Sequence, residues 1–224
     1  MRRRALLALL GCVATAGSTA VLAQTPPKVH RVGLLGPTAP VSDKGVFGAP
    51  LIRGLAQLGY VQGRNLVMER RAVEGQMDRL TRNVDELVAS KVDVIVAVGY
   101  HAALAAKQQM TVPVVVFATG DPIGTGLVES LARPGGNLTG LSDWSAELTP
   151  KRLEFLKEIA PGLRRVAVLW NAGDVGMTLR YRASETGANA MGISVQALGL
   201  REPDDFEDAF NPHSPDEPLE RCER

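Results

Sequence analysis

The residue types that most often carry chemistry are scarce in this sequence. It has three histidines and two cysteines among 224 residues, and none of them stand at the spacing of metal ligands. The glycine-rich words that hold phosphates, GxGxxG and GxxxxGKS or GxxxxGKT, are missing, and so is the GxSxG word of a hydrolase nucleophile. The sequence therefore predicts no catalytic residue, no metal and no cofactor, and it favours a protein that binds a partner without converting it.

Residues that could hold a ligand instead follow runs of apolar residues. The run 112–117, VPVVVF, is typical of a strand buried on both faces of a parallel sheet, and Thr119 and Asp121 come directly after it. Asp121-Pro122 suits the start of a helix, so we expect a helix there with its free N–H groups facing the strand end. Such a corner suits ligand binding. Asp121 itself could contact a ligand ammonium, although capping is the commoner use of Asp-Pro.

The same arrangement recurs after other predicted strands, which cover 31–35, 65–70, 92–98 and 165–170. We expect several of the loops after these strands to face one cleft. In it, Tyr100 could stack on an aromatic ligand or lie half-buried as an ordinary tyrosine. His101 reads more simply as a polar residue of a first helical turn, and Trp144 could line the cleft or pack. The predicted ligand-binding residues are Gly36, Pro37, Thr38, Tyr100, His101, Thr119, Asp121, Asp143, Trp144 and Asn171.

Helices must connect these strands. Apolar residues at helical spacing predict helices over 46–58, 77–88, 102–109 and 177–191, with Pro50 in a first turn, and Thr149-Pro150 begins another. Strands that alternate with helices predict an α/β fold, a parallel sheet with right-handed crossovers and helices on both faces. A nucleotide-binding Rossmann-like enzyme shares this architecture and is the alternative class, although its glycine-rich words are missing.

Several short sequence motifs resemble one family, the extracytoplasmic solute-binding proteins of ABC transporters. It is a type I family that has tryptophan- and tyrosine-type members. The resemblance covers residues 29–210, and its most specific part lies between residues 120 and 140. The words that carry it are Gly120-Asp121-Pro122, Gly124-x-Gly126-Leu127-Val128, Ser130-Leu131-Ala132-Arg133-Pro134-Gly135-Gly136-Asn137, Thr139-Gly140, Leu58-Gly59-Tyr60-Val61, Gly63-Arg64-Asn65-Leu66 and Lys151-Arg152-Leu153-Glu154.

This resemblance implies a type I periplasmic-binding-protein-like fold, with a first lobe over 29–145 and a partial second lobe over 146–210. It implies a small-molecule ligand, such as an aromatic or other amino acid, and a transporter permease and ATPase as partners. At Tyr100-His101 the family usually carries small or hydroxyl residues, so the sequence departs from it there. Family members continue beyond the irregular tail 211–224, so the resemblance also implies a C-terminally truncated copy, which could be non-functional.

The first residues predict export. Arg2, Arg3 and Arg4 precede a weakly apolar run that ends in Val21-Leu22-Ala23, so residues 1–23 read as a signal peptide and the mature chain as periplasmic. A membrane anchor is the less favoured interpretation, because the run contains glycine, serine and threonine. Leu9-Leu10-Gly11-Cys12 resembles a lipoprotein box, and a lipid-anchored chain is the other alternative.

Composition agrees with a small partner. The formal net charge is +1 and 45% of the residues are hydrophobic. This balance provides no strong field for nucleic acid or anionic lipid, so we expect no nucleic-acid partner.

Overall fold

The computed structural model describes residues 28–143, 145–201 and 205–209. The predictions for the signal peptide, for Cys12, for Trp144 and for the tail 211–224 lie outside the described residues. Within the described part no helix has the length and apolar character needed to cross a membrane. The same residues contain no group of three histidine, cysteine or acidic side chains that could hold a metal ion.

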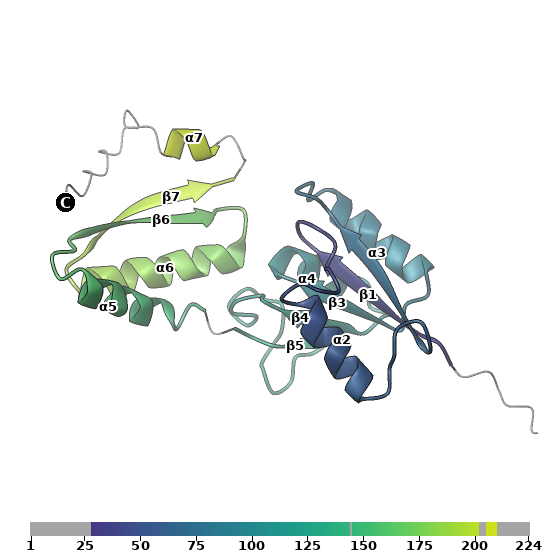
Figure 1. Cartoon of the computed structure of the whole chain (residues 1–224). Helices are drawn as coiled ribbons and strands as arrows, with labels where there is room; N and C mark the ends of the chain where they lie inside the picture. Colours follow the sequence, from purple (N-terminus) through teal and green to yellow (C-terminus); the bar gives the residue numbers. More distant parts are fainter. Residues whose placement is uncertain (1–27, 144, 202–204, 210–224) are drawn as a thin grey trace, which may run out of the picture.

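A parallel sheet of five strands forms the first half of the molecule (Figure 1). Its strands are β1 (His30–Gly36), β2 (Leu66–Ala72), β3 (Val94–Val98), β4 (Val114–Phe117) and β5 (Leu138–Gly140). They lie in the order β2-β1-β3-β4-β5, and every neighbouring pair is parallel. The predicted α/β parallel sheet is therefore confirmed. Because the strand order reverses between β1 and β3, the carboxyl ends of these two strands flank a natural crevice.

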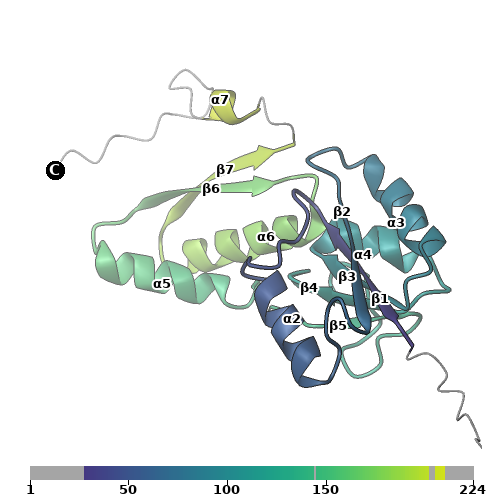
Figure 2. The same ribbon diagram turned by 45° about the vertical axis from the view of Figure 1, so that its right-hand side comes forward.

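Helices cover both faces of this sheet (Figure 2). They are α2 (Gly48–Gln57), α3 (Arg79–Ala89) and α4 (Tyr100–Lys107). Successive side chains of one strand point to opposite faces of the sheet, as the two-residue period of a strand requires. Leu35 packs in the cluster that contains α3 and α4, whereas Leu34 packs in the cluster of α2. Since both leucines are at most 2% exposed, β1 is buried on both sides, and its continuous apolar sequence follows from that.

The second half is a smaller unit built on two parallel strands, β6 (Arg165–Asn171) and β7 (Ser194–Leu200). The helices α5 (Thr149–Ile159) and α6 (Val175–Ala190) pack beneath these strands, and α7 (Asp205–Ala209) lies beside β7 on the other side (Figure 1). Its core is a cluster of Leu153, Val166, Ala188 and Ile193. Pro150 occupies the first turn of α5, where its missing N–H costs nothing, as the sequence predicts.

The helix expected at Asp121-Pro122 does not form. Asp121 does act as a cap, because its Oδ1 accepts hydrogen bonds from the N–H groups of Ile123 and Gly124, at 3.0 and 2.9 Å. The chain then completes only turns before β5. Gly126 has a φ of +72°, a left-handed conformation that ends a right-handed helical turn. The cap was therefore predicted correctly, but the element after it was not.

Two residues of the expected apolar stripe on α2 also lie outside the core. Phe47 and Leu58 are 50% and 76% exposed. Phe47 precedes the helix and its ring packs against that of Phe117, with centroids 5.0 Å apart. A ring so placed remains available at the surface.

Candidate functional site

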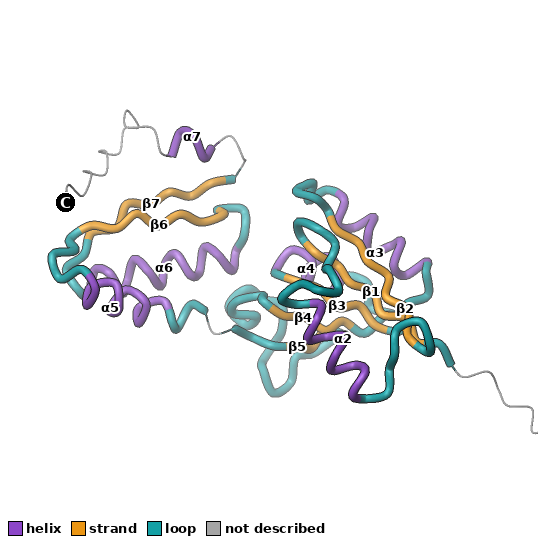
Figure 3. Tube along the Cα trace, viewed as in Figure 1, coloured by secondary structure: helices purple, strands orange, loops and turns teal. Residues whose placement is uncertain are grey.

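A cavity of about 230 Å³ lies between the carboxyl ends of the five-stranded sheet and the first turns of α6. We call it the inter-sheet cavity. The loops that contribute to it follow β1, β3, β4 and β6 (Figure 3). Its lining residues are Pro37, Phe47, Val98, Gly99, Tyr100, His101, Ala118, Thr119, Asp174, Gly176, Met177 and Arg180.

The first turn of α4 meets this cavity with its backbone donors uncapped. Gly99 is the N-cap residue, and no side chain accepts a hydrogen bond at this helix start. Its φ of +82° favours glycine, and its carbonyl already accepts from the N–H of Ala103. Because the first N–H groups of a helix have no partner within it, this end of α4 carries a partial positive charge toward the cavity.

The loop after β4 adds a buried hydroxyl. Thr119 is 2% exposed, and its Oγ1 has no hydrogen-bond partner in the described structure. The residue before it, Ala118, has a φ of +56°, which is strained for a residue with a Cβ atom. A buried hydroxyl without a partner costs about 1 to 3 kcal/mol, so this loop lowers the free energy of unfolding.

The turn between β6 and α6 reaches across to α4. The Met177 N–H donates to Asp174 Oδ1 at 2.9 Å, which caps α6, and the Gly173 N–H donates to Asn171 Oδ1 at 2.9 Å. Asp174 Oδ2 lies 3.5 Å from His101 Nδ1, while His101 Nε2 lies 3.2 Å from the Gly173 carbonyl oxygen. One imidazole therefore joins the two halves of the molecule at the rim of the cavity.

Arg180 makes a second contact between the halves. Its Nη2 donates to Asp143 Oδ2 at 2.8 Å, while Nη1 lies 3.7 Å from the sulfur of Met177. Its Nε is buried and has no hydrogen-bond partner in the described structure. Gly120 lies against this guanidinium, and its φ of +72° is the reason that glycine is favoured there. The guanidinium thus keeps unsatisfied N–H donors beside the cavity.

The structure brings together some of the predicted ligand-binding residues. Pro37, Tyr100, His101 and Thr119 line the cavity. Asp143 does not line it but holds Arg180, and Asp121 and Asn171 serve as caps. Gly36 and Thr38 flank Pro37 without lining the cavity.

Among the lining residues that sequence reasoning missed are Phe47, Met177 and Arg180. Phe47 was assigned to a buried helical stripe. Met177 and Arg180 are three residues apart on α6 and so share one of its faces, which begins at the capping Asp174. Helical spacing counted from the cap would have found them.

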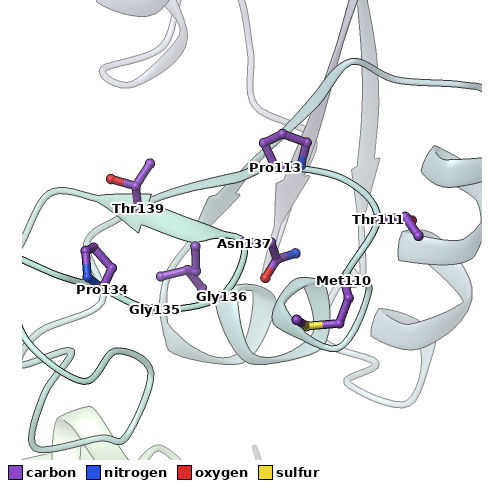
Figure 4. Close-up of a pocket in the computed structure, with 9 residues that line it drawn as sticks. Met110, Thr111, Pro113, Pro134, Gly135, Gly136, Asn137 and Thr139 are labelled. Atoms are coloured by element: carbon purple, nitrogen blue, oxygen red, sulfur yellow. The ribbon is translucent and has the colours of Figure 1, made fainter.

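A larger hollow of about 480 Å³ lies elsewhere, at the amino ends of β4 and β5. Figure 4 shows Met110 and Asn137 on one side of it and Pro134 and Thr139 on the other. None of its lining residues is charged. The Asn137 amide donates to the carbonyls of Gln109 and Val112, at 2.7 and 2.9 Å, and so serves the loop itself. The inter-sheet cavity, with its charged groups and helix ends, is the better candidate site.

Known proteins resemble this chain in sequence and in architecture. Residues 40–213 match the model of a family described as ABC transporter substrate binding protein. A curated relative, the tyrosine-binding protein of Clostridioides difficile strain R20291, is 28% identical over 162 residues, which are 72% of this chain and 46% of the relative. The chain thus spans about half the length of this relative.

Solved structures also match this chain. The crystal structure of a conserved domain protein from Vibrio cholerae superposes with a TM-score of 0.73 at 26% identity. The structure of an ABC domain in complex with L-Trp, from Streptococcus pneumonia, superposes with a TM-score of 0.74 at 23% identity. Each match covers 82% of this chain and 61% of the other. The fold is that of type I periplasmic binding proteins.

Proposed function

Because the chain belongs to the family of ABC transporter substrate-binding proteins, we propose that it is the extracytoplasmic solute-binding component of an importer. In this proposal it binds a small solute in the inter-sheet cavity, does not change it chemically, and delivers it to a membrane permease driven by an ATPase. The periplasm is its compartment, reached through the signal peptide. The observation that carries the proposal is a cavity lined from both halves of the chain and bridged at its rim.

The two halves then act as lobes, residues 29–145 and 146–210, joined by the segment that leads from β5 to α5. A solute that contacts both lobes favours their closed arrangement by its differential affinity for it. The pair of His101 and Asp174 and the pair of Arg180 and Asp143 both span the lobes. They support a closed arrangement in which the solute lies behind these two bridges.

The cavity walls favour a solute with an apolar, ring-sized body. Phe47 and Tyr100 contribute aromatic surface from the first lobe, and Met177 contributes a flexible thioether from the second. The name of the curated relative, a tyrosine-binding protein, agrees with a solute of this size. At about 230 Å³ the cavity is smaller than the pockets that hold drug-sized ligands, which supports a single-ring or two-ring molecule.

Calorimetry and thermal shift with the purified chain test this function. The solutes are tyrosine, tryptophan, phenylalanine and leucine, the corresponding acids without an amino group, and ATP and NAD for the nucleotide-binding alternative. We expect binding by an organic solute of the first two groups, with a rise in the unfolding midpoint. Saturable binding of a nucleotide alone would contradict the proposal.

A matched pair of variants tests the place of binding. Phe47→Ala removes a ring that is 50% exposed and lines the cavity, whereas Phe155→Ala removes a ring that is 51% exposed on α5 and lies outside it. We expect Phe47→Ala to weaken binding about ten-fold, which corresponds to about 1.4 kcal/mol, and Phe155→Ala to leave it unchanged. Equal effects of the two substitutions would place the solute elsewhere.

A further inference from the structure

The donors of hydrogen bonds around the inter-sheet cavity outnumber the acceptors that serve them. Thr119 Oγ1 and Arg180 Nε are buried without a partner in the described structure, and both residues line the cavity. The uncapped first turn of α4 lies beside them. A hydroxyl, a guanidinium and a helix start are the groups that bind a carboxylate or another small anion.

The acidic side chains near the cavity already have cationic or N–H partners. Asp121 accepts from two backbone N–H groups, and Asp143 is paired with Arg180 and accepts from the Ser145 N–H at 3.3 Å. Asp174 uses Oδ1 for the cap of α6 and turns Oδ2 toward His101. Among the lining residues that the structure describes, Asp174 is the single carboxylate.

These assignments leave Asp174 as the one lining carboxylate, among the described residues, that an ammonium group could reach, and its Oδ1 already caps α6. An α-ammonium in the cavity would lie near the positive ends of α4 and α6 and compete with His101 for Asp174. An ammonium group would have to share this one carboxylate with the cap of α6 and with His101, whereas a carboxylate in the same place satisfies donors that otherwise have no partner. The charge of the cavity therefore distinguishes an acid from an amino acid of the same skeleton.

We propose that the solute is a monocarboxylic acid with an apolar, ring-sized body and no α-ammonium group, and that Thr119, Arg180 and the first turn of α4 bind its carboxylate. Phe47, Tyr100 and Met177 then contact the ring. This inference rests on the proposed function, because it names the class of solute that the proposed receptor takes. The proposed solute differs from an amino acid in a single functional group, so binding experiments can distinguish the two classes of solute.

Three probes that share a phenylethyl body make the test. They are 3-phenylpropionate, phenylalanine and phenethylamine, which carry the carboxylate alone, both groups, and the ammonium alone. Calorimetry of the full chain should show 3-phenylpropionate binding at least ten-fold more tightly than phenylalanine, and no heat from phenethylamine. The pairs of 3-(4-hydroxyphenyl)propionate with tyrosine and of indole-3-propionate with tryptophan repeat the comparison for larger rings.

Variants locate the carboxylate. Arg180→Gln should weaken the binding of 3-phenylpropionate at least ten-fold. Arg182→Gln, which changes an exposed residue on the same helix, should leave this binding unchanged. Thr119→Val removes a buried hydroxyl without a partner, so we expect an unchanged or higher unfolding midpoint together with weaker binding of the acid. This opposite response of folding and binding separates a ligand contact from a structural role.

Each result decides one question. Phenylalanine that binds as tightly as 3-phenylpropionate, or more tightly, overturns this inference and leaves the proposed function standing. Acid binding that neither Arg180→Gln nor Thr119→Val weakens overturns the assigned carboxylate site, and with it the inference. If no member of the three pairs binds at millimolar concentration, the proposed function itself is wrong for this chain.

Discussion

The two halves of the molecule differ in how they are held together. Strand β1 has five consecutive buried residues, whereas β6 alternates between buried or half-buried and exposed positions. Of the largest fully buried side chains in the described part, Ile193 alone belongs to the two-stranded unit. The five-stranded unit is therefore a stable platform that presents Gly99, Tyr100 and Thr119. The smaller unit has less core of its own, and we expect it to open at a lower free energy.

The largest effect should come from the core of the platform. Leu35→Ala removes a leucine with no exposed surface, so we expect a loss of about 2 to 5 kcal/mol in the free energy of unfolding. Leu169→Ala, on β6 and 40% exposed, should cost less than about 1 kcal/mol. Urea denaturation followed by circular dichroism measures both changes. Equal losses would mean that the two-stranded unit is packed as tightly as the platform.

A smaller effect is expected where the two units meet. Asp174→Ala removes both the cap of α6 and the contact with His101, and we expect a loss of about 1 kcal/mol, mainly from the cap. Asp174→Asn keeps a capping oxygen but not the charge, so it should retain most of the stability while weakening the contact between the units. Small-angle scattering should then show a larger radius of gyration for both variants. An unchanged radius would show that this contact does not hold the units together.

The smallest effect is one of pH and belongs to the surface of the platform. A hydrogen bond from the Arg71 guanidinium, with a second from Arg82, holds the pKa of Glu86 below its usual value. A lowered pKa in the folded state stabilises the fold above the pKa of the unfolded chain, and this contribution is lost as the pH falls through the folded value. Glu86→Gln should therefore lower the unfolding midpoint slightly at pH 7, and the difference from the parent should disappear near pH 3. A difference that persists at pH 3 would contradict this assignment.

The sequence predicts the platform better than the site. Runs such as 94–98 are apolar throughout because their strands are covered on both faces, and the sequence alone shows this. The turn after Asp121 escaped prediction because a capping aspartate followed by a proline begins both long helices and single turns. Here the single turn ends at Gly126. Arg180 escaped because its role depends on Asp143, which is distant in sequence and meets it only in the folded chain.

The double role of Asp174 affects the entropy of the contact between the two units. Its side chain is already fixed by the cap of α6, since Oδ1 accepts from Met177 within the same unit. Little rotamer freedom of Asp174 therefore remains to be lost when its Oδ2 meets His101. An ordinary surface ion pair would have to immobilise two free side chains at that moment. A contact prepared in advance on one side can form quickly and release quickly, which would suit the proposed capture and release of a solute.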